Sequence, residues 1–139
     1  MSTIAMYPGS FDPVTNGHLD IVKRSSRMFD KVIVAVLVNS AKTPLFTVEE
    51  RVAMLRDACK NIPNVEIDSF NGLTVSFAKQ KGATVMVRGL RAVTDFENEI
   101  QLAHTNFAMM PEIETVFLAT AIKWSYLSST IVREAAHYG

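Results

Sequence analysis

Five short apolar runs recur along the chain, and each has the composition of a β-strand. The run over residues 31–38 is an almost continuous series of β-branched and aliphatic side chains. Such a run is typical of a strand buried on both faces of a parallel sheet. Residues 65–70 alternate apolar and polar positions, as in a half-buried strand. The predicted strands are residues 4–7, 31–38, 65–70, 84–87 and 114–118.

Stretches with helical spacing separate these runs. Thr47 and Glu50 form a capping-box pattern that predicts a helix start, and Gly82 predicts the end of a short helix. We expect Leu73 to point inward in that short helix. The first helix is expected to bury Leu19, Val22, Ser26 and Phe29, with Ile21, Ser25 and Met28 beside them. The predicted helices are residues 17–29, 47–61, 73–81, 95–109 and a last one from Ser128 or Ser129 to about His137.

Alternating strands and helices predict an α/β fold with a single doubly wound, five-stranded parallel sheet and right-handed crossovers. The sequence shows no repeat, low-complexity segment or linker. We therefore expect one domain over residues 1–139, a length close to the commonest domain size.

The charge balance narrows the choice of partners. Fourteen basic and fourteen acidic residues cancel, which argues against a general nucleic-acid or membrane surface. Cys59 is the only cysteine, so we expect no disulfide, a structural thiol and a reducing, cytoplasmic setting. No apolar run reaches transmembrane length, and we expect no secretory signal.

Unusual polar residues follow four of the five predicted strands. In an open parallel sheet these positions share one edge, where ligands bind. Arginine and lysine there, with helix N-termini and hydroxyl groups, suit phosphate groups. Each cation taken alone could equally be a solvated surface charge. The four groups are Ser10 to His18, Lys42, Arg88 to Arg91, and Trp124 to Thr130.

Several other kinds of site are disfavoured. The first loop lacks Gly-x-Gly-x-x-Gly, and neither a P-loop nor a Gly-x-Ser-x-Gly elbow is present. His104 and His137 lie on other predicted helices than His18, so the three histidines have no zinc-ligand spacing. The residues alone thus favour a phosphate-binding crevice without identifying its ligand.

With these motifs assembled, the chain closely resembles the bacterial phosphopantetheine adenylyltransferases of the nucleotidyltransferase superfamily. The similarity follows the family's order and spacing through nearly the whole chain. The matching motifs are Tyr-Pro-Gly-Ser-Phe-Asp-Pro-Val-Thr-Asn-Gly-His (7–18), Phe-Thr-Val-Glu-Glu-Arg (46–51), Val-Arg-Gly-Leu-Arg-Ala-Val-Thr-Asp-Phe-Glu (87–97), Gln-Leu-Ala-His (101–104) and Trp-Ser-Tyr-Leu-Ser-Ser-Thr (124–130).

The resemblance implies a Rossmann-like nucleotidyltransferase fold and an adenylyl transfer from ATP to 4′-phosphopantetheine. The products are dephospho-coenzyme A and pyrophosphate, at the penultimate step of coenzyme A synthesis. The attacking phosphate is already anionic, so alignment and charge stabilisation suffice for catalysis. The resemblance also implies Mg²⁺ bound with ATP, a homohexamer, and coenzyme A as a feedback inhibitor.

The resemblance assigns a role to each matching residue. His18 is expected to stabilise the transition state, and Ser10, Lys42 and Arg91 complete the catalytic set. The phosphopantetheine side is expected to use Ser10, Lys42, Thr74 and Arg88. The ATP side is expected to use Ser10, Phe11, His18, Gly89, Leu90, Arg91, Glu99, Trp124, Ser125, Tyr126, Leu127, Ser128, Ser129 and Thr130.

The chain departs from the family pattern at a few positions. Ser10 stands where threonine is common and Thr130 where serine is frequent, and both keep a hydroxyl group. Thr74 occupies a variable position, and relatives continue beyond the position of Gly139.

Two alternatives stay open at this level. One is another superfamily member that acts on nicotinamide mononucleotide or uses CTP. The other is a nucleotide-binding module without catalysis, although His18, Lys42 and Arg91 argue against it.

Overall fold

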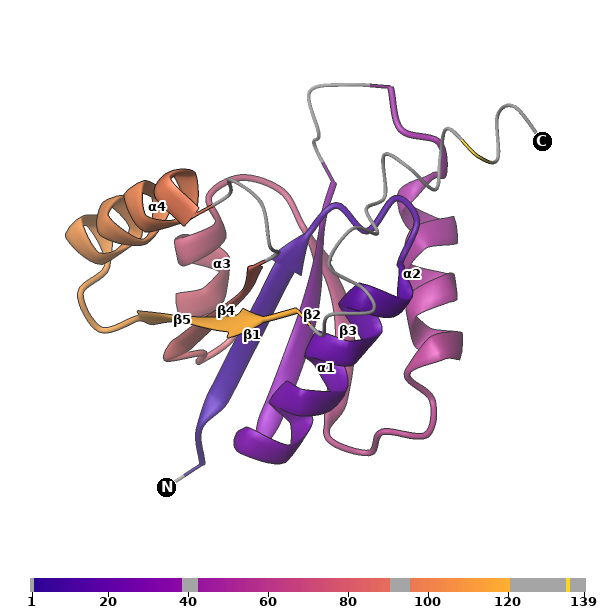
Figure 1. Cartoon of the computed structure of the whole chain (residues 1–139), viewed down its shortest axis with the longest axis horizontal. Coiled ribbons are helices and arrows are strands. Elements are labelled where there is room, and N and C mark those ends of the chain that lie inside the picture. The colour runs from indigo at the N-terminus through magenta and orange to yellow at the C-terminus, as the bar shows by residue number, and fades with distance from the viewer. Residues whose placement is uncertain (1, 39–42, 91–95, 121–134, 136–139) are drawn as a thin grey trace.

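A computed structural model describes residues 2–38, 43–90, 96–120 and 135 (Figure 1). All five predicted strands are present: β1, β4 and β5 are longer than predicted by one or two residues, β3 agrees and β2 is one residue shorter. The four described helices match the predictions to within three residues at each end. The fifth predicted helix lies outside the described residues. The elements are β1 (Ile4–Gly9), α1 (Asn16–Met28), β2 (Lys31–Leu37), α2 (Val48–Ala58), β3 (Val65–Phe70), α3 (Thr74–Gln80), β4 (Val85–Leu90), α4 (Phe96–Met109) and β5 (Glu114–Ala119).

The strands form a parallel sheet in the order β3-β2-β1-β4-β5, which confirms the predicted sheet. Met6 of β1 lies opposite both Ile33 of β2 and Met86 of β4. The chain winds outward from β1 to β3 and then returns to β4 on the other side of β1. The strand order therefore reverses between β1 and β4, and a ligand crevice is expected at the carboxyl ends of these two strands.

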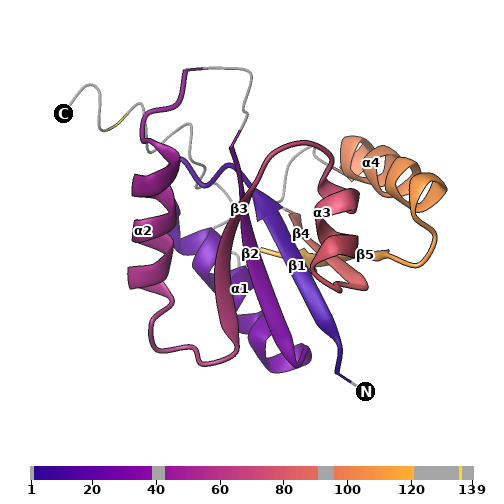
Figure 2. The same ribbon diagram turned by 180° about the vertical axis from the view of Figure 1, so that it is seen from behind.

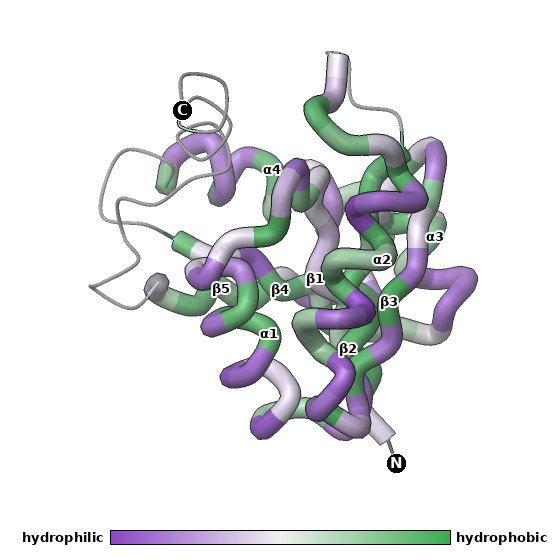
Figure 3. Tube along the Cα trace, turned by 90° about the vertical axis from the view of Figure 1, so that its right-hand side faces the viewer, coloured by the Kyte–Doolittle hydropathy of each residue, from purple (hydrophilic) through white to green (hydrophobic). Residues whose placement is uncertain are grey.

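Helices cover both faces of the sheet (Figures 1 and 2). Alternate strand residues divide between the two faces, because successive side chains in a strand point in opposite directions. Tyr7 and Val34 belong to one buried cluster with α1 and α2, whereas Met6 and Ile33 belong to the cluster that includes α3. Figure 3 shows hydrophobic stretches in the strands, whereas hydrophobic and hydrophilic residues alternate along the helices.

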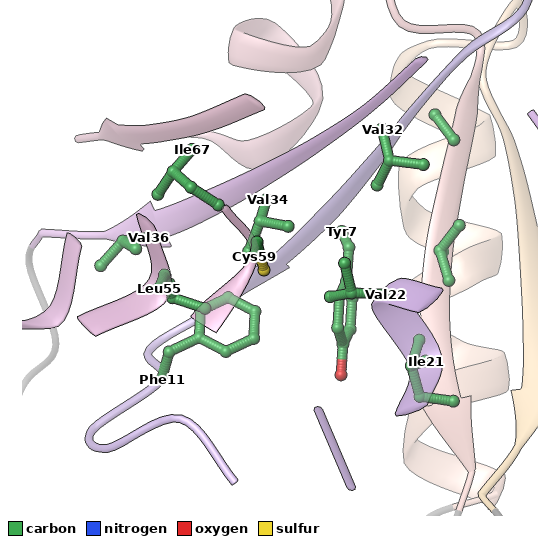
Figure 4. Close-up of a cluster of buried hydrophobic side chains, with 12 residues drawn as sticks. Tyr7, Phe11, Ile21, Val22, Val32, Val34, Val36, Leu55, Cys59 and Ile67 are labelled. Carbon is green, nitrogen blue, oxygen red and sulfur yellow. The ribbon is translucent and has the colours of Figure 1, made fainter. Parts of the chain in front are cut away.

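The cluster under α1 and α2 reaches the loop that follows β1. Phe11 packs against Leu55 in this cluster and is only 2% exposed (Figure 4). Its ring meets that of Tyr7 edge to face, with centroids 5.3 Å apart. The hydrophobic core thus extends to the point where the site loop begins.

The helix boundaries agree with the sequence better than the helix faces do. Thr47 and Glu50 form the predicted capping box, and Gly82 has the positive φ of 78° that favours glycine. Leu73 was expected to be buried but is 59% exposed, because it is the N-cap of α3 and precedes its first turn. Met28 is 56% exposed in the last turn of α1. The buried residues of α1 are Gly17, Ile21, Val22 and Ser25.

Among the described helices, none is both long enough and apolar enough to cross a bilayer.

An ion-pair network joins the edge strand β3 to its neighbours. Lys81 Nζ lies 3.1 Å from Glu66 Oε2 and 2.9 Å from Asp68 Oδ2, and Lys31 Nζ lies 3.0 Å from Glu66 Oε1. Hydrogen bonds from Lys31 and Lys81 lower the pKa of Glu66. Partial burial opposes ionisation of Asp68, but the hydrogen bonds from Lys81 and the Ser69 N–H, with nearby positive charge, lower its pKa overall.

This network predicts a stability term that depends on acid pH. A carboxyl group with a lowered pKa stabilises the fold above its ordinary pKa, here 4.5 for Glu66 and 3.8 for Asp68, and the contribution is lost as pH falls through the lowered value. Lys81→Met should therefore reduce the free energy of unfolding by ~0.5–1 kcal/mol at pH 7. Urea denaturation should show this difference shrinking below pH 4.5.

Lys60→Met is the matched control, since it removes the same charge from a pair whose side chains are 66% and 80% exposed. It should leave the free energy of unfolding almost unchanged at every pH. An effect of Lys81→Met that stayed constant from pH 7 to pH 3 would contradict the assignment.

Candidate active site

The fold brings the described members of the predicted site to the edge where the parallel strands end. Ser10 and Phe11 follow β1, and His18 lies in the first turn of α1. Thr74 opens α3, and Glu99 lies in the first turn of α4. Arg88, Gly89 and Leu90 end β4. The other predicted members lie outside the described residues: Lys42, Arg91, Trp124, Ser125, Tyr126, Leu127, Ser128, Ser129 and Thr130.

The loop after β1 has an unusual backbone. Phe11 has a φ of 48°, in the left-handed region that L-residues seldom occupy, and the Asp12–Pro13 bond is cis. A Cβ added at Gly9 would lie 3.1 Å from the Phe11 ring, so glycine at this position lets the ring fold back beneath the loop. The buried aromatic ring and the turn together fix where residues 10–12 lie.

Asp12 ties this loop to the segment that precedes α2. Its side chain is only 4% exposed. Its Oδ2 accepts a hydrogen bond from Leu45 N at 2.8 Å, and its Oδ1 accepts one from Phe46 N at 2.9 Å. A buried carboxylate needs such donors. The loops after β1 and β2 are thereby held together.

Arg51 makes the complementary contacts from α2. Its side chain is 1% exposed. Nη1 donates to the carbonyl oxygens of Ser10 at 2.9 Å and Leu37 at 3.3 Å, and Nε donates to that of Thr47 at 3.4 Å. One guanidinium group therefore links the ends of β1 and β2 to the start of α2. The sequence alone does not predict this role, because a helical pattern identifies a polar position without its tertiary partners.

His18 is held in a defined orientation by the start of α1. Its Nδ1 accepts a hydrogen bond from Thr15 N at 3.0 Å, and Thr15 Oγ1 accepts one from His18 N at 3.2 Å. The two residues thus form a capping box. A nitrogen that accepts an N–H bond carries no proton, so the neutral imidazole has its proton on Nε2. The imidazole therefore has a hydrogen-bond donor at Nε2.

Aromatic contacts restrict the imidazole further. The His18 ring meets the Phe11 ring nearly at right angles, with centroids 4.9 Å apart, and the Tyr7 ring at 6.5 Å. The helix N-terminus adds partial positive charge at the same place. The local environment therefore combines an oriented donor with a field that favours an anion.

Arg88 and Glu99 form a bidentate ion pair. Arg88 Nη2 lies 2.7 Å from Glu99 Oε1, and Nε lies 2.9 Å from Oε2. Arg88 Nη1 also donates to the Pro8 carbonyl at 3.3 Å. The side chains are 27% and 13% exposed. The resemblance had assigned these residues to different substrates, and the structure places them in direct contact.

A groove runs beside this pair on the face of the sheet that carries α3. Thr74 and Arg88, both expected on the phosphopantetheine side, line the same groove. It has about 390 Å³ of space, part of it open to solvent. Its other lining residues are mainly apolar, which suits a ligand with an extended neutral arm. They are Pro8, Gly9, Leu37, Phe70, Met86, Leu102 and Asn106.

Cys59 lies in the core and away from these groups. Burial raises the pKa of its thiol, and the charge of Lys23 only partly opposes this. A buried thiol of raised pKa is a poor nucleophile, in agreement with the structural role expected for it.

Comparison with known proteins agrees with this geometry. Residues 6–135 match the family model described as cytidylyltransferase-like. The chain is 58% identical to the phosphopantetheine adenylyltransferase of Lachnoclostridium phytofermentans, over 98% of this chain and 83% of that protein. It is 59% identical to the enzyme of the same name from a Nostoc species, over 98% of this chain and 71% of that protein.

A solved structure supports the fold independently. A bifunctional NMN adenylyltransferase/ADP ribose pyrophosphatase from Francisella tularensis superposes with a TM-score of 0.73 at 17% identity, over 100% of this chain and 43% of that one. At this identity the match concerns the fold alone. The sequence matches go further, and the chain belongs to the cytidylyltransferase-like family and, within it, to the phosphopantetheine adenylyltransferases.

Proposed function

We propose that the chain transfers the adenylyl group of ATP to 4′-phosphopantetheine by direct in-line attack. Membership of the phosphopantetheine adenylyltransferases supports the reaction, which forms dephospho-coenzyme A in coenzyme A synthesis. A phosphate oxygen of 4′-phosphopantetheine bonds to the α-phosphorus of ATP. The bond from that phosphorus to the bridging oxygen breaks, and pyrophosphate leaves with the electron pair. The attacking oxygen is anionic, so no general base is needed.

The observation that carries the mechanism is the hydrogen bond from the Thr15 N–H to Nδ1 of His18. It places the proton of the neutral imidazole on Nε2, which can therefore act as a donor. A preorganised donor stabilises charge that develops on a non-bridging α-phosphate oxygen without reorganising during the reaction. The N-terminus of α1 strengthens the effect. Ser10 and the Phe11 backbone, on the adjoining loop, contribute further donors to phosphate.

Arg88 is proposed to bind the phosphate of 4′-phosphopantetheine. The ion pair with Glu99 uses one N–H of Nε and one of Nη2, and Pro8 uses one of Nη1. Among the described residues these contacts involve three of the five guanidinium N–H groups, which leaves a pair that can bind an oxyanion. Lys42 and Thr74 complete this side of the proposal, and Arg91, Gly89, Leu90, Glu99 and residues 124–130 complete the ATP side.

Magnesium is proposed to bind together with ATP. In the described part of the chain no three histidine, cysteine or carboxylate side chains lie close enough to hold a metal ion. Mg²⁺ often keeps several waters and few protein ligands, so we propose that phosphates and water hold most of its coordination positions. When bound, Mg²⁺ would neutralise phosphate charge.

Assembly and regulation remain proposals that follow from the family. Phe96 and Phe107 of α4 are 58% and 48% exposed and share one helical face, and such exposed aromatic rings suit contact between copies in a homohexamer. Coenzyme A contains the product's structure, so it is expected to compete for the same crevice as a feedback inhibitor. Sedimentation velocity and inhibition kinetics test the two expectations separately.

The substrate assignment predicts pyrophosphate release only with the correct acceptor. The protein incubated with ATP, Mg²⁺ and 4′-phosphopantetheine should release pyrophosphate, as measured by a coupled phosphate assay. Nicotinamide mononucleotide as acceptor, or CTP in place of ATP, should give little release. Turnover with nicotinamide mononucleotide and none with 4′-phosphopantetheine would contradict the assignment.

The role of His18 predicts a large loss in kcat. His18→Ala should lower kcat at least ~100-fold, as for removal of one preorganised oxyanion donor. His104→Ala is the matched control, because His104 lies exposed on α4 and outside the proposed site. Thr15→Ala removes the other half of the capping box, and should cost stability with a smaller effect on kcat. A folded His18→Ala protein with wild-type kcat would exclude the proposed mechanism.

The role of Arg88 predicts selectivity between the substrates. Arg88→Met should raise KM for 4′-phosphopantetheine at least ~10-fold, because a charge-assisted bidentate contact is lost, while KM for ATP changes less. Arg56→Met, on the opposite layer and outside the groove, is the control for loss of one positive charge. Equal rises in both KM values would refute a specific acceptor role.

A further inference from the structure

We infer that Arg51 is a positioning residue for the reaction, acting through the peptide bond between Ser10 and Phe11. This inference rests on the proposed function, in which the Ser10 hydroxyl and the Phe11 backbone bind phosphate. Arg51 is 1% exposed, so it reaches the site only through the groups it contacts. The sequence motif that contains it, residues 46–51, assigns it no role.

The carbonyl of Ser10 and the N–H of Phe11 belong to one planar trans peptide, and they point in opposite directions. Arg51 Nη1 donates to that carbonyl at 2.9 Å, on the core side of the loop. The Phe11 N–H is therefore turned away from Arg51, toward the crevice side. No described residue accepts a hydrogen bond from it.

The backbone of Phe11 is strained. Its φ of 48° is costly for an aromatic residue, and such a conformation persists only where the surroundings enforce it. Rotation of the Ser10–Phe11 peptide would relieve the strain and would turn a carbonyl oxygen toward the bound phosphate. The charge-assisted bond from Arg51 opposes this rotation.

The other contacts of Arg51 hold its guanidinium group in place. The same group also donates to the carbonyls of Leu37 and Thr47, so its position is fixed by β2 and by the start of α2. Asp12 holds the facing segment through Leu45 N and Phe46 N. A lysine has a single nitrogen, so it could not donate at the same time from the two positions that Nη1 and Nε of Arg51 occupy. The arrangement is thus specific for arginine.

The test compares Arg51→Lys and Arg51→Met with the wild type. Both variants should lower kcat/KM for ATP ~10–100-fold, in line with the loss of an oriented phosphate donor. Asn64→Ala is the control for a purely structural effect. Its amide Nδ2 binds the carbonyls of Ser26, Phe29 and Asp30, where α1 ends, far from the crevice. It should lower stability while kcat/KM stays within ~2-fold of the wild type.

A second readout does not depend on turnover. In ¹H–¹⁵N spectra the Phe11 amide of the wild type should shift when ATP is added, and this shift should be lost in Arg51→Lys. If the wild-type amide did not respond, the proposed phosphate site would be wrong and this inference would fail with it. If it responded equally in both proteins, and folded Arg51→Lys kept wild-type kcat/KM, only the positioning role of Arg51 would be overturned.

Discussion

The site depends on two buried charged side chains that hold the loop after β1 in place. A carboxylate and a guanidinium group are costly to bury, and both are compensated here by backbone hydrogen bonds. Asp12 binds two N–H groups of the segment before α2, and Arg51 binds carbonyls at the ends of β1 and β2. These contacts cross between loops that are far apart in sequence. They hold the loop after β1 against the segment before α2 and the end of β2.

His18 has a structural role as a helix cap and a proposed role in catalysis. As a cap, His18 accepts the Thr15 N–H and stabilises the first turn of α1. The same bond determines which ring nitrogen carries the proton, so the start of the helix sets which nitrogen can donate in the proposed mechanism. Arg88, which is proposed to bind phosphate, is likewise oriented by protein contacts, with Glu99 and with the Pro8 carbonyl. In both cases a hydrogen bond within the protein orients a donor that is proposed to bind phosphate.

Much of the fold could be predicted from the sequence. The β-branched run at residues 31–38 identifies β2 to within one residue, and the capping box at Thr47 identifies the start of α2, although α2 ends at Ala58 rather than at the predicted residue 61. Side-chain burial was harder to predict. Leu73 was expected inside but caps α3, since an apolar residue at a helix start has no fixed direction. The single-domain organisation over residues 1–139 stays a prediction, as do the roles of Lys42, Arg91 and residues 124–130, which the structure does not describe.

The sequence predicts where the candidate site lies, at one edge of the sheet, but not which residues contact one another there. The alternation of strands and helices brings Ser10, His18 and Arg88 to the same edge of any such sheet. The contacts of buried Arg51 include carbonyl groups at the ends of two other segments, at Ser10 and Leu37, and a backbone carbonyl group is present at every position whatever the residue type. The pairing of Arg88 with Glu99 joins a strand to a helix eleven residues further on, and no periodicity rule covers such a pair.

In the proposed mechanism, His18 donates through Nε2 to an α-phosphate oxygen while Nδ1 stays bound to the start of α1. A structure with a non-hydrolysable ATP analogue and 4′-phosphopantetheine is the most direct test of this contact. It should show His18 Nε2 within ~3 Å of a non-bridging α-phosphate oxygen, with the Thr15 N–H still on Nδ1. An α-phosphate beyond hydrogen-bond distance of His18, or an imidazole that has exchanged the roles of its two nitrogens, would contradict it.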